Sequence, residues 1–421
     1  MAPVCAAAFA ALMAPLGPFE ARPRLAVAVS GGADSLALAL LAVDWARARG
    51  GSVTGFVVDH RLRDGSAAEA ADACARLQRH GVAWRRLTLQ GLLAGPGLAE
   101  RARAARYDAL RAACAEAGIL HLLLGHHAAD QAETLAMREL SGSGPAGLAG
   151  MAALVETASL RLLRPLLPVP PGRLRATLRA IGESWAEDPS NTDLRAMRPR
   201  LRALHADPEG NGPAIRGRLG DSARFGAHRH AADIRMVEEL ARWVSFHPEG
   251  FATFSPGPIA GASLAAALRV VAGRRYPLPL GQVDRLAARP EAATLGGARI
   301  IAAGKRGWRV LREAAAMAPP VVAGPGACWD NRFRLGAAEL PDSASLGALG
   351  DAAAGMRRHS DLPAAILRTL PALRVGAELV AVPHLRYWQD GWNNVRAGWT
   401  ASPVPAAPAA FVCANFTFAD P

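Results

Sequence analysis

The segment that most constrains the fold is Ser30-Gly31-Gly32-Ala33-Asp34-Ser35, which follows the apolar run of residues 25–29 and leads into a helical pattern over residues 35–47. A short apolar run predicts a buried strand, so the chain passes from a strand through a glycine pair into a helix. The glycines let backbone N–H groups close around an oxyanion, and the serine hydroxyls and the helix N-terminus add donors. The segment therefore predicts a phosphate-binding loop, although it lacks the lysine of the G-x-x-x-x-G-K-[ST] type.

The strand-to-helix alternation continues for three more units. Further strands are predicted over residues 53–58, 82–89 and 119–124, with helices over residues 66–80, over residues 98–117 and from about residue 129 onward. Ser66 and Glu69 have the spacing of a capping box at the first of these helices. Four successive units predict an α/β fold with a doubly wound parallel sheet, whose ligands bind at the carboxyl ends of the strands.

The sequence after the four strand-helix units predicts further domains. With 421 residues, the chain is longer than one hydrophobic core normally organises. We expect a domain over residues 1–205, a mainly helical region over residues 206–295, and a small α+β domain over residues 296–421. In the last domain, residues 299–303 and 308–312 flank a glycine-bounded turn and predict a hairpin. Further strands are expected over residues 329–335 and 378–382.

The net charge of +12 comes almost entirely from arginine, because Lys305 is the only lysine. Most of the excess, +10, falls after residue 150. Clustered arginines bind phosphates, so a nucleic-acid partner would contact the later part of the chain. A GC-rich genome is an alternative source of the same composition.

The cysteine pattern and the hydropathy argue against several classes of protein. The five cysteines are scattered without a C-x-x-C pair, which argues against a disulfide framework or a zinc ribbon. No apolar stretch is long enough to predict a membrane span. The apolar run of residues 4–16 lacks a basic start, so it predicts a docking helix and not a signal peptide. We expect a cytoplasmic protein.

Polar residues that could bind a ligand or take part in catalysis follow three of the predicted strands. Ser30, Asp59 and His126 come at strand ends, which places them along one edge of a parallel sheet. Asp130 and Glu133 are three positions apart on a predicted helix and share a face, so they offer a carboxylate pair for an ammonium group or Mg²⁺. A zinc site is not expected, since no cysteine lies near the histidines, and no metal ligand is assigned.

The sequence resembles the tRNA(Ile)-lysidine synthetase family, within the enzymes whose pyrophosphatase loop directs attack at the α phosphate of ATP. Ordered motifs over residues 25 to about 202 carry the resemblance: the Ser30–Ser35 loop, Val58-Asp59-His60-Arg61-Leu62-Arg63, Arg103-Ala104-Ala105-Arg106-Tyr107, Gly125-His126-His127-Ala128-Ala129-Asp130-Gln131-Ala132-Glu133-Thr134, Arg164-Pro165-Leu166-Leu167 and Glu187-Asp188-Pro189-Ser190-Asn191. The resemblance implies an adenine nucleotide alpha hydrolase-like, Rossmann-like catalytic domain. It also implies catalytic roles for Asp34, Arg106, His126, Asp130 and Glu133, and ATP binding by Ser30, Gly31, Gly32, Ala33, Asp34, Ser35, Asp59 and His60.

The activity implied by the resemblance is ligation of free L-lysine to carbon 2 of the wobble cytidine in isoleucine tRNA with a CAU anticodon. ATP and Mg²⁺ are the implied cofactors, and a homodimer is compatible with the reaction. Three alternatives remain at this stage: a sulfur-transferring tRNA modifier, an amide ligase for a small metabolite, and an RNA-binding module without activity.

Some positions depart from the family pattern. Ala129, Ser141 and Ala196 replace residues that are common in the family, as does Arg61. Pro199 is expected to interrupt a helix that would otherwise align the neighbouring arginines. We expect altered tRNA contacts there and retained chemistry.

Overall fold

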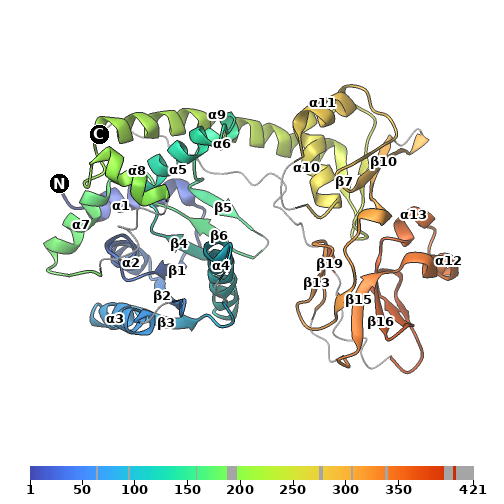
Figure 1. Cartoon of the computed structure of the whole chain (residues 1–421), viewed down its shortest axis with the longest axis horizontal. Helices are drawn as coiled ribbons and strands as arrows, with labels where there is room; N and C mark the ends of the chain where they lie inside the picture. The colour runs from blue at the N-terminus through green and yellow to red at the C-terminus, as the bar shows by residue number, and fades with distance from the viewer. Residues whose placement is uncertain are drawn as a thin grey trace. The chain divides into compact units, whose positions relative to one another are not determined.

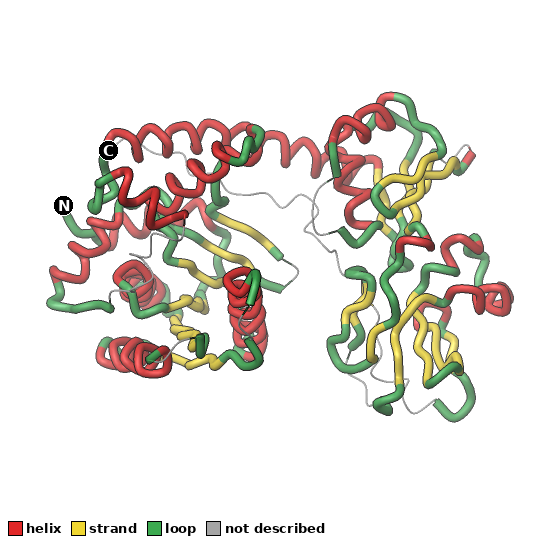
Figure 2. The backbone as a smooth tube through the Cα atoms, viewed as in Figure 1, coloured by secondary structure: helices red, strands yellow, loops and turns green. Residues whose placement is uncertain are grey.

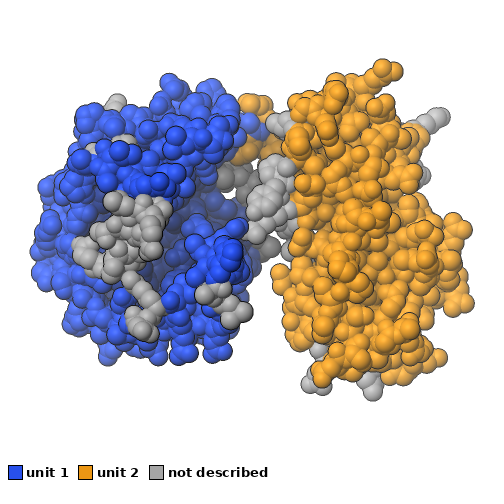
Figure 3. All heavy atoms as spheres, in the orientation of Figure 1, with its two compact units in different colours: residues 1–232, 411–421 blue, residues 233–410 orange. Residues whose placement is uncertain are grey.

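The computed structural model describes residues 1–62, 65–92, 95–157, 159–186, 197–274, 278–304, 307–336, 340–392 and 402–403. The chain forms two compact units, of which unit 1 contains Met1–Ala232 and unit 2 contains Asp233–Ala410 (Figure 3). None of the described helices is long and apolar enough to cross a membrane.

Unit 1 is built on one six-stranded sheet (Figure 1). Its strands are β1 (Arg24–Val29), β2 (Ser52–Asp59), β3 (Ala83–Thr88), β4 (His121–Leu124), β5 (Leu154–Glu156) and β6 (Arg161–Leu163). They are arranged in the order β3-β2-β1-β4-β6-β5, and every neighbouring pair is parallel except β5 with β6. The predicted parallel α/β sheet is confirmed.

The central strand β1 is buried on both faces of the sheet. Leu25, Val27 and Val29 of β1 belong to one core with α2 (Ala33–Arg47) and α3 (Ser66–Arg79). Ala26, the residue between two of them, belongs to a second core with α4 (Leu98–Glu116). Successive side chains of a strand point to opposite faces, so the two cores lie on opposite sides of the sheet, with α2 and α4 flanking β1 (Figure 1). This is the expected doubly wound arrangement.

Other helices complete unit 1. They are α1 (Ala6–Met13), α5 (Ala128–Leu140), α6 (Pro145–Leu148), α7 (Pro171–Ala180), α8 (Met197–His205) and α9 (Pro213–Trp243), the last of which continues into unit 2. Figure 2 shows the strands of unit 1 gathered among these helices. The expected docking helix near the N-terminus is confirmed, since Phe9 and Met13 of α1 are fully buried in the α2 core.

Two local predictions were wrong. Ser66 and Glu69 form no capping box, because the N-cap of α3 is Gly65, and the Ser66 hydroxyl donates to Asp59 Oδ1 at 2.9 Å. Pro199 does not interrupt a helix, because α8 begins at Met197 and Pro199 lies in its first turn. Backbone N–H groups in a first helical turn have no intrahelical acceptor, so a proline there loses nothing.

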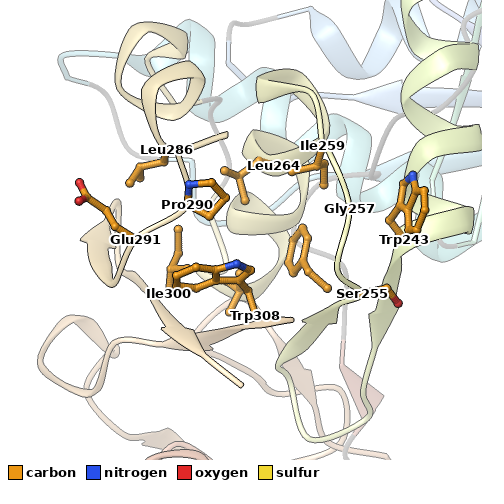
Figure 4. Close-up of a pocket in the computed structure, with 12 residues that line it drawn as sticks. Trp243, Ser255, Gly257, Ile259, Leu264, Leu286, Pro290, Glu291, Ile300 and Trp308 are labelled. Atoms are coloured by element: carbon orange, nitrogen blue, oxygen red, sulfur yellow. The ribbon is translucent and has the colours of Figure 1, made fainter. Parts of the chain in front are cut away.

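The first part of unit 2 is a five-stranded antiparallel sheet covered by two helices. The sheet contains β7 (Val244–Phe246), β8 (Ala252–Phe254), β9 (Ala293–Leu295), β10 (Ala298–Ala302) and β11 (Trp308–Arg312) in the order β7-β8-β11-β10-β9, and the helices are α10 (Gly261–Val271) and α11 (Leu280–Ala288). The predicted hairpin is confirmed by the pairing of β10 with β11. A small apolar pocket of about 30 Å³ opens beside this core between Trp308, Leu286 and Trp243 (Figure 4).

The second part of unit 2 contains two more sheets. One has the order β12-β15-β16-β17-β18, from β12 (Val321–Val322), β15 (Ala344–Ala348), β16 (Pro371–Val375), β17 (Glu378–Val382) and β18 (Tyr387–Trp388). The other pairs β13 (Cys328–Trp329), β14 (Phe333–Arg334) and β19 (Ser402–Pro403). Short helices α12 (Ala353–Met356) and α13 (Ala364–Leu367) complete this part. Residues 329–335 form a tight hairpin instead of one strand, since Asp330 and Asn331 turn the chain with positive φ angles.

A buried ion network lies at this hairpin. Asp330 Oδ1 accepts from Arg312 Nη2 at 2.7 Å, and its Oδ2 accepts from Arg332 Nε at 2.7 Å. Arg332 also donates to the carbonyls of Gly250 and Thr369. Because these partners come from β11, from the β7–β8 loop and from the segment before β16, the network joins the two parts of unit 2.

Candidate active site

The Ser30–Ser35 loop connects β1 to α2 at the carboxyl end of the strand. Gly31 has a φ of 88°, a conformation that side-chain-bearing residues rarely adopt. Gly32 is the N-cap of α2, and no side chain caps the helix. The N–H groups of the first turn therefore remain for an anionic ligand, as the sequence predicts.

The two serines of the loop form hydrogen bonds with each other. Ser35 Oγ accepts from the backbone N–H of Ser30 at 3.1 Å and lies 3.1 Å from Ser30 Oγ. It also donates to the Gly32 carbonyl at 3.2 Å. These bonds hold both hydroxyls in place before a ligand binds, which lowers the entropic cost of binding.

A pocket of about 210 Å³ opens at this loop. Its walls come from the loop, from the carboxyl ends of β2 and β4 with the residues that follow them, and from the middle of α4. The lining residues include Ser30, Gly32, Asp34, Ser35, Phe56, Val58, His60, Arg106, Tyr107, Gly125 and His126. The structure thus brings together most of the predicted nucleotide-site residues. Arg106 supplies a positive charge, and burial lowers the pKa of its guanidinium without discharging it near neutral pH.

His126 is a neutral polar group in this pocket. Burial, followed by the charge of Arg164, lowers the pKa of His126 to about 3. Its Nδ1 atom is buried and has no hydrogen-bond partner among the described residues. Buried polar atoms are normally paired, so this nitrogen marks a position where a bound polar group is expected.

Asp59 lies beside the pocket but does not line it. It is 2% exposed, and its Oδ1 accepts from the Arg61 N–H and the Ser66 hydroxyl at 3.1 and 2.9 Å. These contacts fasten the turn after β2 to the start of α3. The structure therefore places Asp59 under the loop that carries His60, not against the cavity itself.

The carboxylate pair lies on α5, close to the same loop. The Asp130 carboxylate accepts from the His127 N–H at 3.1 Å, and His127 Nδ1 lies 3.4 Å from the Asp130 backbone N, so the two residues face each other at the start of α5. His127 Nε2 is 3.4 Å from Asp34 Oδ2 and 3.6 Å from Asp130 Oδ2. Burial alone would lower the pKa of His127, but Asp130 and Asp34 raise it to about 9. An imidazolium therefore links the nucleotide loop to the carboxylate pair.

Two arginines of α8 meet the carboxylate pair. Arg202 Nη2 lies 3.2 Å from Asp130 Oδ1, and Arg198 Nη1 lies 3.6 Å from both Asp130 Oδ1 and Glu133 Oε2. Burial raises the pKa of Glu133 despite Arg202, whereas the charge of His127 lowers the pKa of Asp130 against the effect of burial. The pair thus binds the cationic arginines already, and the pKa of one carboxyl is lowered while that of the other is raised.

Sequence reasoning missed these arginines as partners of the carboxylates. Their spacing of four residues was a usable signal, because it places Arg198 and Arg202 on one face of a helix.

The motif at residues 187–191 and Ala196 lie outside the described residues. Within the described part of the chain, no group of three or more histidine, cysteine or acidic residues has the geometry of a metal site.

The family model of the PP-loop domain matches residues 1–206. The tRNA(Ile)-lysidine synthase of Ruegeria pomeroyi is 36% identical over 395 residues, which covers 89% of this chain and 92% of the relative. The enzymes with the same name from Bradyrhizobium diazoefficiens and Rhodopseudomonas palustris are each 37% identical, over 320 and 315 residues, and are covered to 89% and 90%. These matches cover 72% and 68% of this chain.

Proposed function

Because this chain belongs to the tRNA(Ile)-lysidine synthase family, we propose that its two linked subsites join ATP-dependent activation of a tRNA base to attack by lysine. Its PP-loop domain uses ATP, and the enzyme is a ligase. One observation carries the proposal beyond the family: His127 contacts Asp34 of the nucleotide loop and Asp130 of the carboxylate pair. The proposed anion-binding and cation-binding subsites are neighbours in this arrangement.

The first step would occur at the loop. Oxygen 2 of the wobble cytosine attacks the α phosphorus of ATP, and pyrophosphate leaves. The N–H groups at the start of α2 and the Ser30 and Ser35 hydroxyls would hold the phosphates, while Arg106 would offset negative charge in the transition state. His126, neutral near pH 7, would offer its unpaired Nδ1 as a hydrogen-bond partner to the bound nucleotide or base.

The second step would use the carboxylate pair. The ε-amino group of lysine attacks carbon 2 of the adenylated cytosine, the oxygen leaves with AMP, and the amine loses a proton. Asp130, with its lowered pKa, would hold the ammonium form, and Glu133, with its raised pKa, suits acceptance of that proton. In the structure the Arg202 guanidinium lies where the ammonium would bind, so lysine would exchange with it.

Mg²⁺ fits this loop through Asp34. The Oδ1 atom of Asp34 is buried and has no hydrogen-bond partner among the described residues, whereas its Oδ2 faces His127. Magnesium in nucleotide sites is held by one or two carboxylates together with phosphate oxygens and water. Bound there, it would neutralise charge on the phosphates.

We propose that the substrate is isoleucine tRNA with a CAU anticodon and that residues after 205 contact it. Single-stranded anticodon bases are accessible to proteins, and arginine-rich surfaces bind phosphates. In this division residues 206–295 and 296–421 hold the RNA, and residues 1–205 carry the chemistry.

The direct test is transfer of radiolabelled lysine to an unmodified CAU-anticodon isoleucine transcript in the presence of ATP and Mg²⁺. Wild-type protein is expected to transfer label only with ATP, and Ser30→Ala and Asp130→Ala are expected to transfer far less. Glu139→Gln is the matched control, because Glu139 lies on the same helix as Asp130 but pairs with Arg218. Binding of tRNA and ATP without lysine transfer by the wild type would refute the ligase assignment for this chain.

A further inference from the structure

The segment after α7 contacts the back of the nucleotide loop. The Ala186 N–H donates to the Gly31 carbonyl at 3.1 Å, and the Glu183 N–H donates to the Leu178 carbonyl at the end of α7 at 3.0 Å. Residues 183–186 therefore run from α7 to the loop.

This contact fixes a peptide plane of the loop. In a trans peptide the C=O and the following N–H point in opposite directions. When Ala186 holds the Gly31 carbonyl, the Gly32 N–H points away from Ala186. Gly32 lines the pocket, so the bond with Ala186 favours the orientation in which this N–H is available to a phosphate.

A charged cluster on α3 holds the same segment. The Glu183 side chain is only 8% exposed, and its Oε1 lies 3.0 Å from Arg79 Nη2 and 3.3 Å from Arg76 Nη1. Its Oε2 lies 2.7 Å from His80 Nε2. Burial favours the neutral carboxyl, but the hydrogen bond from His80 and the charge of Arg79 lower the pKa of Glu183, so it is ionised near neutral pH.

Further contacts limit the segment to this path. Arg76 Nη1 also donates to Ser184 Oγ at 2.9 Å. Trp185 packs against the α2 core, with the Arg179 guanidinium 5.6 Å from its ring centroid. Glu183 is thus the acidic centre of a basic cluster, and together with Ser184 it attaches the segment to α3.

We propose that Glu183 is a positioning residue for ATP: it anchors residues 183–186 to α3, and through the Ala186–Gly31 bond it orients the Gly32 N–H toward the bound phosphate. This inference rests on the proposed ATP site and adds a residue that does not itself line the pocket.

The test is a calorimetric titration of the full-length protein with ATP and Mg²⁺, without tRNA. Glu183→Gln is expected to weaken ATP binding by about 3- to 10-fold, less than the loss of a direct charged hydrogen bond to the ligand, because Glu183 acts on the loop indirectly. Asp72→Asn is the matched control, because Asp72 pairs with the same Arg76 at 2.8 Å but does not contact residues 183–186. Lysine binding and the unfolding temperature are expected to match wild type in both variants.

A double-mutant cycle separates positioning from general destabilisation. Ala186→Pro removes the N–H that holds Gly31, and it is expected to weaken ATP binding about as much as Glu183→Gln. If Glu183 acts through this bond, the double variant binds no more weakly than either single variant. Wild-type affinity in Glu183→Gln, fully additive losses, or an equal loss of lysine binding would each overturn the proposal. If wild-type protein binds ATP but transfers no lysine, the ligase assignment fails, and the titration still decides the role of Glu183.

Discussion

Arg202 Nε donates a hydrogen bond to Glu133 Oε1 at 2.5 Å, although 69 positions separate the two residues in the sequence. Glu133 is buried, with a side chain only 2% exposed. A buried carboxylate without a partner is costly, so Arg202 both neutralises the site and occupies it.

Replacing Arg202 by methionine is expected to destabilise unit 1 by about 1–3 kcal/mol, because the buried Glu133 loses its hydrogen-bond donor. Free lysine should then supply the missing cation. We therefore expect lysine to raise the unfolding temperature of Arg202→Met more than that of wild type, as measured by thermal denaturation at several lysine concentrations. An equal shift in both proteins would show that lysine does not use the site of Arg202.

Asp130→Asn removes one negative charge from the proposed ammonium site. The expected result is a rise in KM for lysine of about tenfold or more, because a charged hydrogen bond contributes about 1.5–3 kcal/mol. The KM for ATP should change less, since Asp130 does not line the nucleotide pocket. Steady-state kinetics of the variant and of Glu139→Gln check this, and similar KM values for lysine in both variants would contradict it.

Gly125 packs against the start of α2. A Cβ added at Gly125 would lie 3.1 Å from both the Cα and the N of Ser35, a contact with backbone that side-chain motion cannot relieve. Gly125→Ala is therefore expected to shift the loop and weaken ATP binding several-fold. Gly144→Ala is the control, because no atom lies within 4 Å of its added Cβ. ATP titrations of the two variants should differ clearly.

The stability of unit 1 is expected to depend on pH through His127. Its pKa is raised from 6.5 to about 9 in the folded protein, so folding favours the charged form. The stabilisation is complete below about pH 6.5 and is lost as the pH rises through about 9, with a magnitude on the order of 3 kcal/mol or less. Urea unfolding of wild type and His127→Gln between pH 6 and 10 measures it. The stability difference between the two should shrink as the pH rises, and a constant difference would contradict the assignment.

Asp330→Asn is expected to destabilise unit 2 by about 3–5 kcal/mol, because it leaves the buried guanidinium groups of Arg312 and Arg332 without a carboxylate. Asp351→Asn is the control, since its salt bridge with Arg368 is exposed. Fluorescence of the fully buried Trp329 can report unfolding of this unit in urea. Equal midpoints in the two variants would show that the buried network contributes little.

The strand and helix pattern of unit 1 was predictable because its signals are local. The predicted strand over residues 53–58 and the observed Ser52–Asp59 differ by one residue at each end. The three-residue strands β5 and β6 carry too short a pattern to be identified, and the long helix α9 was foreseen only as part of a mainly helical region over residues 206–295. The hairpin at Asp330 depends on two residues with positive φ, which the sequence does not mark with glycine.

The sequence predicted those site residues that lie at the ends of neighbouring strands. It did not predict side-chain contacts between residues that are far apart in the sequence. Ser30 and His126 come to one pocket because β1 and β4 are neighbours in the sheet. The ion pairs of Arg202 with α5 and of Glu183 with α3 depend on how helices pack, and residue type and spacing alone do not specify their partners. Asp59 lies at the carboxyl end of β2, as predicted, but its side chain accepts a hydrogen bond from Ser66 and does not line the cavity.

The central strand β1 lies between β2 and β4, so the nucleotide pocket consists of segments that are almost one hundred residues apart in the chain. No short fragment contains the whole pocket, and long-range strand pairing must precede any tight binding of ATP. Contacts of this kind form slowly during folding, because loop closure must come first. Once they form, a ligand that binds only the assembled sheet adds to its stability through mass action. In a cell with ample ATP, the substrate would also act as a stabiliser of the newly folded enzyme.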